Sequence, residues 1–210
     1  KSLLRVSAFF CEIAPLVQSG RLSPVDLVAG CLEAARTRSS LNAFITLMAD
    51  QARADAERAR SEIASGHYRG PLHGIPIAVK DLIDVAGTKT TSGSALPVTA
   101  AAADAPVITR LREAGAIIIG KTNLHEFAFG TTSDETAFGP VRHPLDESRS
   151  AGGSSGGSAV ALATGMAFGA LGTDTGGSIR IPSAVCGLVG LKPALGEVST
   201  AGVVPLSGTL

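Results

Sequence analysis

The sequence predicts an α/β fold in which helices cover a mixed, partly parallel sheet. The first observation is a change after residue 70, from Ala-, Glu- and Arg-rich segments to short apolar runs bounded by Gly and Pro. The second is that three such runs, 74–81, 116–123 and 167–174, contain or end in a polar group, with a helix-like segment at 105–115. Such alternation is typical of parallel strands, whose carboxyl ends form the edge where ligands bind.

The first 70 residues are expected to be mainly helical. Ser23 has the position of an N-cap, Pro24 follows at the first helical position, and apolar residues recur at helical spacing through Ala35. A second helix is expected over 49–66, which is rich in Ala, Glu and Arg and stops at a glycine. We expect these helices on the outside of a single domain over 1–210, whose α/β core occupies 71–210.

Composition and charge restrict the class of protein. The 210 residues are 45% hydrophobic, enough for the core of one large domain, and the 18 basic and 18 acidic residues give no electrostatic footprint for nucleic acid or an anionic membrane. Three widely spaced cysteines, Cys11, Cys31 and Cys186, fit buried thiols in a reducing compartment. No basic region leads into an apolar leader, and the uncharged segment 151–173 is rich in Gly and Ser, which favours a buried helix and strand over a membrane span. We therefore expect a cytoplasmic protein.

Three motif matches fail on their context. Residues 115–122 fit the phosphate-loop expression, but 116–119 have the character of the strand itself, whereas that loop must follow a strand. The "GGSSG" at 152–156 fits the nucleophile elbow, yet all four histidines precede Ser154, so the order Ser, acid, His cannot be met. His125 in "HEF" lacks a second histidine, and no Cys/His cluster is present, so no metal site is expected.

Two glycine- and serine-rich clusters remain, at 152–158 and 174–178, on either side of one apolar segment. Each cluster alone is compatible with a flexible loop. Together they suggest a serine nucleophile, because "DTGGS" offers consecutive backbone N–H donors for an oxyanion just before Ser178. Without a histidine base, a lysine at the end of an apolar strand is the candidate, since burial lowers its pKa. Lys80 and Lys121 both fit, and the residues do not choose between them.

These stretches resemble the amidase signature family. The resemblance rests on "HGIPIAVKDLIDVAG", "GKTNLHEFAFG", "GGSSGGSAVALATG" and "ALGTDTGGSIRIPSAVCGLVGLKP", in that order and spacing. The segments "SPVDLVAGCLEAA" and "LNAFIT" also look like the family's N-terminal helices. The resemblance implies a layered α/β/α amidase signature fold. It also implies that the chain is the N-terminal part of a longer one, because family members continue well past residue 210.

The resemblance further implies a Ser-Ser-Lys triad. Ser178 matches the nucleophile, Ser154 matches the bridging serine that members hold in a cis peptide, and Lys80 matches the base, which leaves Lys121 a structural role. The expected oxyanion donors are the N–H groups of Thr175, Gly176, Gly177 and Ser178. Around them, Asp174 is expected to orient the site, Arg180 to pair with an acid or contact a substrate carboxylate, and Ser155 and Ser158 to support the loop.

The implied function is an amide hydrolase that acts through an acyl-enzyme on Ser178, and releases ammonia or an amine from a small carboxamide. No metal or organic cofactor is required, and a homo-oligomer is possible. One alternative is the glutaminase subunit of a tRNA-dependent amidotransferase, and another is a catalytically inactive binding domain on the same fold. His125 stands where that subunit group tends to have an acid, which favours the free-standing amidase.

Overall fold

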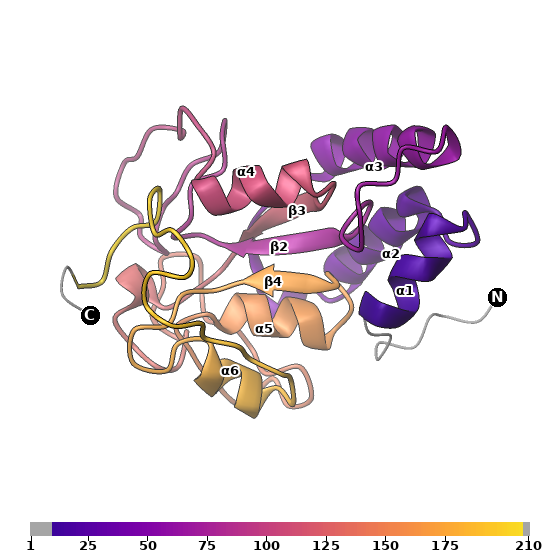
Figure 1. The fold of residues 1–210 in the computed structure, drawn as a ribbon. Coiled ribbons are helices and arrows are strands. Elements are labelled where there is room, and N and C mark those ends of the chain that lie inside the picture. The colour runs from indigo at the N-terminus through magenta and orange to yellow at the C-terminus, as the bar shows by residue number, and fades with distance from the viewer. Residues whose placement is uncertain (1–9, 208–210) are drawn as a thin grey trace.

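The computed structural model describes residues 10–207, with side chains from residue 12 onward. Its centre is one four-stranded sheet in the order β1-β3-β2-β4 (Figure 1). The strands are β1 (Phe44–Leu47), β2 (Pro76–Lys80), β3 (Ile117–Thr122) and β4 (Gly169–Leu171). Strand β2 runs parallel to both β3 and β4, and β1 runs antiparallel to β3, so the predicted mixed sheet is confirmed.

The register brings the carboxyl ends of the three parallel strands to one edge. Lys80 pairs with Thr122 across β2 and β3, and Val79 pairs with Leu171 across β2 and β4. The phosphate-loop match at 115–122 is therefore excluded, since β3 itself occupies most of it. The polar groups that follow these strands share the edge where parallel sheets usually bind ligands.

The helices are α1 (Phe10–Gln18), α2 (Pro24–Thr37), α3 (Ala49–Ala64), α4 (Pro106–Glu113), α5 (Gly156–Ala163) and α6 (Arg180–Val185), with 3₁₀ turns η1 (Ser39–Leu41) and η2 (Glu126–Ala128). Ser23 caps α2 as predicted, because its hydroxyl accepts the N–H of Val25 at 3.2 Å. The prediction missed β1 within the mainly helical first third. This strand has four residues, and its pairing with β3 decides its conformation, so the local sequence carries a weak signal.

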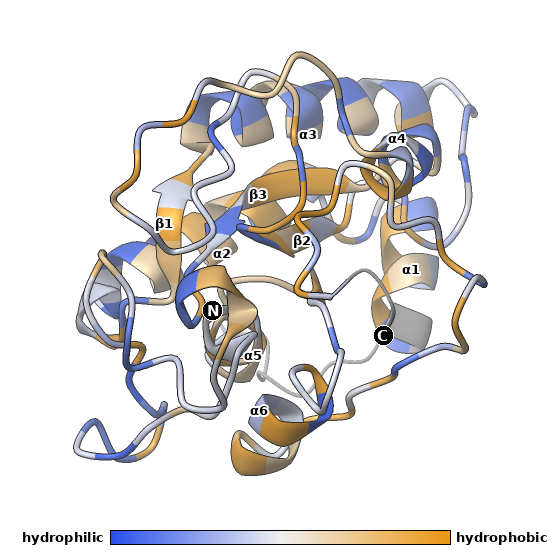
Figure 2. Cartoon of the chain, turned by 90° about the vertical axis from the view of Figure 1, so that its left-hand side faces the viewer, coloured by the Kyte–Doolittle hydropathy of each residue, from blue (hydrophilic) through white to orange (hydrophobic). Residues whose placement is uncertain are grey.

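Alternate residues of the central strands pack into two hydrophobic clusters, as the two-residue period of a strand requires. Ala78, Ile117 and Ile119 join side chains from α2, α3 and α5. Ile77 and Ile118 join side chains from α1 and α4 instead. Helices α4 and α5 accordingly lie on opposite sides of β2 in Figure 1, and Figure 2 shows hydrophobic central strands with hydrophilic segments along α3.

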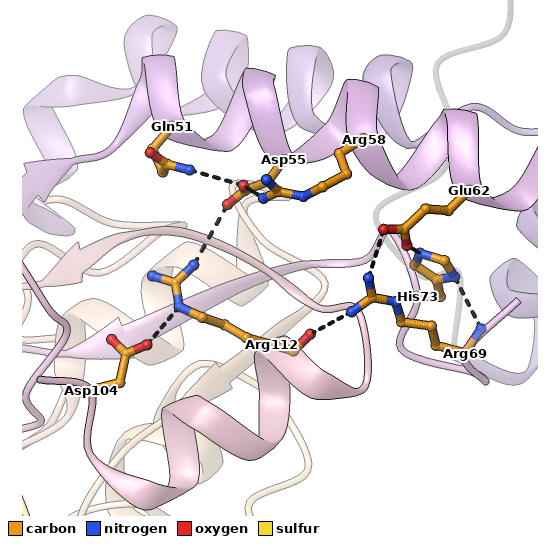
Figure 3. Close-up of polar contacts among 8 residues, drawn as sticks. All are labelled: Gln51, Asp55, Arg58, Glu62, Arg69, His73, Asp104 and Arg112. Carbon is orange, nitrogen blue, oxygen red and sulfur yellow. Dashed lines mark hydrogen bonds and ion pairs between the residues drawn. The ribbon is translucent and has the colours of Figure 1, made fainter. Parts of the chain in front are cut away.

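A polar network ties α3 to α4 at the amino end of β3 (Figure 3). Arg112 of α4 lies 2.9 Å from Asp104 and 3.6 Å from Asp55 of α3. Further along α3, Glu62 pairs with Arg69 at 2.6 Å and with His73 at 3.1 Å. Because acids and bases are matched throughout, this network joins two helices rather than presenting a charged site.

The described residues show no helix that is both long and apolar enough to cross a membrane. Within the same part of the chain, no group of His, Cys, Asp and Glu has the arrangement to hold a metal ion. Cys31 is buried and Cys186 half-buried, and both are free thiols, while the side chain of Cys11 lies outside the described residues. Burial raises the pKa of Cys31 to about 12 and that of Cys186 to about 11, so both behave as packing residues.

Candidate active site

Lys80, the last residue of β2, is fully buried, and among the described residues its amine donates hydrogen bonds to two hydroxyl groups. Its Nζ lies 2.7 Å from Ser154 Oγ and 2.8 Å from Thr173 Oγ1, and no described carboxylate is within ion-pair distance. Burial lowers the pKa of Lys80 to about 7, although the negative charge of Asp174 opposes that shift. A large fraction of this amine is therefore neutral near pH 7 and can accept a proton.

Ser154 is fully buried and follows a cis peptide bond between Gly153 and Ser154. Its carbonyl oxygen accepts two hydrogen bonds, from the backbone N–H of His125 at 3.2 Å and from Ser133 Oγ at 3.3 Å. Its side chain faces Lys80. The backbone of Ser154 is thus held from outside its own loop, while its hydroxyl is left to the lysine.

Ser178 lies in the turn that leads into α6 and is 8% exposed. Its carbonyl oxygen accepts the N–H of Ser155 at 3.1 Å, which joins the turn to the loop of Ser154. The Oγ of Ser178 has no hydrogen-bond partner among the described residues. The fold therefore brings both serine clusters together and leaves this hydroxyl available.

The turn before α6 exposes backbone donors. The N–H groups of Thr175, Gly176 and Ser178 have no acceptor within the described part of the chain. The N–H of Gly177 differs, because it donates to Asp174 Oδ1 at 2.7 Å. Three of the four expected oxyanion donors thus remain open, while Gly177 supports the turn.

Asp174 organises this turn. Arg180 donates two hydrogen bonds of 2.9 Å to its carboxylate through Nε and Nη2, and the N–H groups of Gly177, Ile179 and Arg180 donate to it as well. Burial by itself raises the pKa of Asp174, but the hydrogen bonds from Arg180 and from these N–H groups outweigh it and hold the pKa well below its ordinary value. Of the two expectations for Arg180, its geometry here is that of the ion-pair partner.

Two further hydroxyls donate hydrogen bonds to β4 and to the residues that follow it. A third hydroxyl, near Lys80, was not predicted from the sequence. Ser155 Oγ donates to the carbonyl of Thr173 at 3.2 Å, and Ser158 Oγ donates to the carbonyl of Leu171 at 3.0 Å. Thr173 was not singled out, although its hydroxyl contacts Lys80. The sequence signal that could have identified Thr173 is its place between β4 and Asp174, at the sheet edge where the parallel strands end.

Lys121 is separate from these serines. Its Nζ lies 2.7 Å from Asp81 Oδ1 and donates to the carbonyl of Lys89 and the hydroxyl of Thr90, both at 3.2 Å. Both members of the ion pair are buried. Lys121 therefore anchors the segment after β2, and of the two candidate lysines only Lys80 contacts Ser154.

One cavity among the described residues has a volume of about 590 Å³. It is lined by Ser94, Ala95, Leu96, Glu126, Phe127, Thr136 and Ala137. None of the three triad candidates lines it.

Known proteins resemble this chain over nearly all of its length. The Amidase profile matches residues 26–210. The A subunit of glutamyl-tRNA(Gln) amidotransferase from Anaeromyxobacter dehalogenans is 46% identical over 92% of this chain and 40% of its own length. The mitochondrial protein of that name from Ixodes scapularis is 43% identical over 95% of this chain and 41% of its own length. The chain thus spans about two fifths of these curated relatives.

Solved structures agree with that relationship. A crystal structure of an amidase superposes with a TM-score of 0.92 at 46% identity, covering 96% of this chain and 46% of the other. Native peptide amidase from Stenotrophomonas maltophilia gives 0.90 at 38% identity, covering 96% and 43%. The A subunit of the Thermotoga maritima glutamyl-tRNA(Gln) amidotransferase gives 0.82 at 35% identity, covering 100% and 43%. The chain therefore belongs to the Amidase family, as the resemblance of its glycine- and serine-rich motifs implied.

Proposed function

We propose that this chain carries the acyl-transfer centre of an amide hydrolase, with Ser178 as nucleophile, Ser154 as proton relay and Lys80 as base. One observation carries the proposal. The amine of Lys80 is buried, contacts no carboxylate of the described residues, and lies 2.7 Å from Ser154 Oγ, in a loop that is bonded directly to the turn of Ser178. A buried amine of this kind can act as a base because burial favours its neutral form, which accepts a proton.

The first step forms a tetrahedral intermediate on Ser178. Ser178 Oγ attacks the amide carbonyl carbon as its proton passes to Ser154 Oγ, and the proton of Ser154 passes to the neutral amine of Lys80. The carbonyl electron pair moves to oxygen, where the open N–H groups of Thr175 and Gly176 are available to hold the negative charge. Removing one such donor costs about 3–4 kcal/mol of transition-state stabilisation in other hydrolases.

The next step reverses the proton path and forms the acyl-enzyme, which water then hydrolyses. As the tetrahedral intermediate collapses, the C–N bond breaks, and the proton on Lys80 returns through Ser154 to the leaving nitrogen. Water then attacks the ester of Ser178 and gives up a proton along the same route, so that the carboxylic acid leaves and the three side chains are restored. The cycle uses groups of this chain and water.

The relatives favour glutamine as the amide that is cleaved. Both curated relatives described above are named as the A subunit of a glutamyl-tRNA(Gln) amidotransferase, which supports the glutaminase alternative over the free-standing amidase that His125 favoured. We therefore propose that the whole protein releases ammonia from glutamine as one component of a multi-chain complex. A single-chain amidase is the second candidate, because a solved amidase is 46% identical to this chain. The cytoplasmic location stays a prediction.

The test uses the full-length protein together with any chains that copurify with it. A fluorophosphonate should label the wild type and leave Ser178→Ala unlabelled, and the same substitution should abolish ammonia release from glutamine. Acetamide-like, aryl and fatty acyl amides, assayed in parallel, separate the glutaminase from the single-chain amidase. Turnover retained by Ser178→Ala contradicts the assignment of the nucleophile, and a wild type that neither labels nor hydrolyses any amide supports the inactive binding domain.

A further inference from the structure

The helix that follows Ser154 starts without a cap of its own. The residue at its N-cap position, Ser155, makes no side-chain hydrogen bond to the first turn. The first N–H groups of α5 are bound by distant residues instead. Gly156 N–H donates to Ser133 Oγ and Gly157 N–H donates to the carbonyl of Asn123, both at 3.1 Å. Because the first N–H groups of a helix need external acceptors, Ser133 and Asn123 take over the role of the cap.

The hydroxyl of Ser133 acts on this loop as both an acceptor and a donor. It accepts the N–H of Gly156 at 3.1 Å and donates to the carbonyl oxygen of Ser154 at 3.3 Å. One side chain therefore holds both ends of the short segment 154–156. The second donor to the Ser154 carbonyl, the N–H of His125, is a backbone group and carries no comparable link to α5.

The loop has been shaped around Ser133. A Cβ at Gly153 would lie 2.7 Å from Ser133 Oγ, and one at Gly156 would lie 2.6 Å from it, closer than real side chains approach. Glycine at these two positions thus leaves room for the hydroxyl. Ser133 is itself fully buried with a left-handed φ of 59°, and its carbonyl accepts the N–H of Val141 at 3.0 Å. Its position is set by the surrounding structure.

We propose that Ser133 is a positioning residue that aims the hydroxyl of Ser154 between Lys80 and Ser178. This inference rests on the proposed function, because the position of the Ser154 hydroxyl matters for the rate only if Ser154 relays the proton. Ser133 itself is given no contact with substrate. Without the hydroxyl, the carbonyl of Ser154 keeps only the bond from His125 and the N–H of Gly156 loses its acceptor. The N–H of Ser155 still donates to Ser178, so the loop stays attached to the turn but is held less firmly around Ser154. A displacement of about 1 Å in such a relay can cost about 100-fold in rate.

The experiment compares Ser133→Ala with Ser150→Ala in the full-length protein. Ser150 is a matched control, since its hydroxyl donates to the carbonyl of Thr132 and accepts the N–H of Gly152 in the same way, yet does not touch Ser154. Ser133→Ala should lower kcat at least about tenfold with KM nearly unchanged. Ser150→Ala should change kcat by less than about threefold.

Fluorophosphonate labelling separates positioning from misfolding. A positioning role predicts that Ser133→Ala still labels Ser178 to full stoichiometry, but with a lower rate constant and a lower kcat per labelled site. Reduced stoichiometry with unchanged kcat per site would mean a structural role and overturn the inference. If Ser133→Ala does not fold, Ser133→Gly accommodates the left-handed φ without a hydroxyl and should show the same slow labelling.

A parallel Ser154→Ala variant separates a failure of the proposed function from a failure of the positioning role of Ser133. If Ser154→Ala retains wild-type kcat, the proposed function fails. If Ser154→Ala is inactive while both Ser133 variants turn over at the wild-type rate, the proposed function stands and the positioning role of Ser133 is wrong.

Discussion

Lys80 and Lys121 lie near the ends of neighbouring strands, are both fully buried, and differ in what surrounds their amines. Lys80 contacts the hydroxyls of Ser154 and Thr173, whereas Lys121 lies 2.7 Å from the carboxylate of Asp81. Burial favours the neutral form of an amine, and a carboxylate in contact favours the charged form. The difference teaches that the partner, rather than burial alone, decides whether a buried lysine acts as a base or as an anchor.

The sheet itself separates the two amines. Lys80 pairs with Thr122 and Lys121 pairs with Val79 in the parallel register of β2 and β3. Because successive side chains of a strand point to opposite faces, the two lysines leave the sheet on different sides. Lys80 faces α5 and the serine loops, while Lys121 faces the segment that follows β2. A difference of one residue in the strand register therefore places Lys80 beside the serine loops and Lys121 in a structural ion pair.

The largest effect is expected from Lys80→Met. This change removes the proton acceptor of Ser154 while keeping a side chain of similar length, so kcat should fall by about 10²–10⁴-fold, the contribution of a positioned general base. Steady-state ammonia release, with active sites counted by labelling, measures it. The variant should still fold, because the groups that lose their partner are the hydroxyls of Ser154 and Thr173 and not a buried charge. A variant that keeps more than half of wild-type kcat would refute the role of this amine.

The counterpart, Lys121→Met, should act on stability rather than on rate. It leaves the carboxylate of Asp81 buried and without its cation, which costs about 3–5 kcal/mol in the free energy of unfolding. Chemical denaturation measures this loss, and kcat measured well below the melting temperature should fall far less than in Lys80→Met. The double variant Asp81→Asn with Lys121→Met should recover most of the stability, since no unpaired charge remains. A double variant as unstable as the single one would count against an ion pair as the cause.

The fold was predictable where a local pattern carries it. Ser23 and Pro24 marked the start of α2, and the apolar runs marked β2, β3 and β4, because caps and buried strands are written in consecutive residues. Strand β1 was missed, because a four-residue edge strand is fixed by its partner across the sheet. Long-range pairing of this kind leaves little trace in the segment itself.

The candidate site was predictable to a similar extent. Residue chemistry alone led to Lys80 and Lys121 equally, since both follow an apolar run, and the contact of Lys80 with Ser154 arises only from the register of the sheet. The hydroxyls of Thr173 and Ser133 were missed, because nothing in the local sequence shows that they meet Lys80 and Ser154. Such contacts join segments that are distant in the chain.

The pH dependence gives the smallest and sharpest test of the comparison. Because only the neutral amine of Lys80 accepts a proton, and burial lowers its pKa to about 7, kcat/KM should rise by about tenfold per pH unit below that value and level off above it. Asp174 opposes the shift through its negative charge, so Asp174→Asn should move the inflection to lower pH. Lys121→Met should leave the inflection in place, because its amine takes no part in the proton path. Profiles measured for the three proteins with one amide substrate decide this, and an inflection that follows Lys121 instead would reverse the roles of the two lysines.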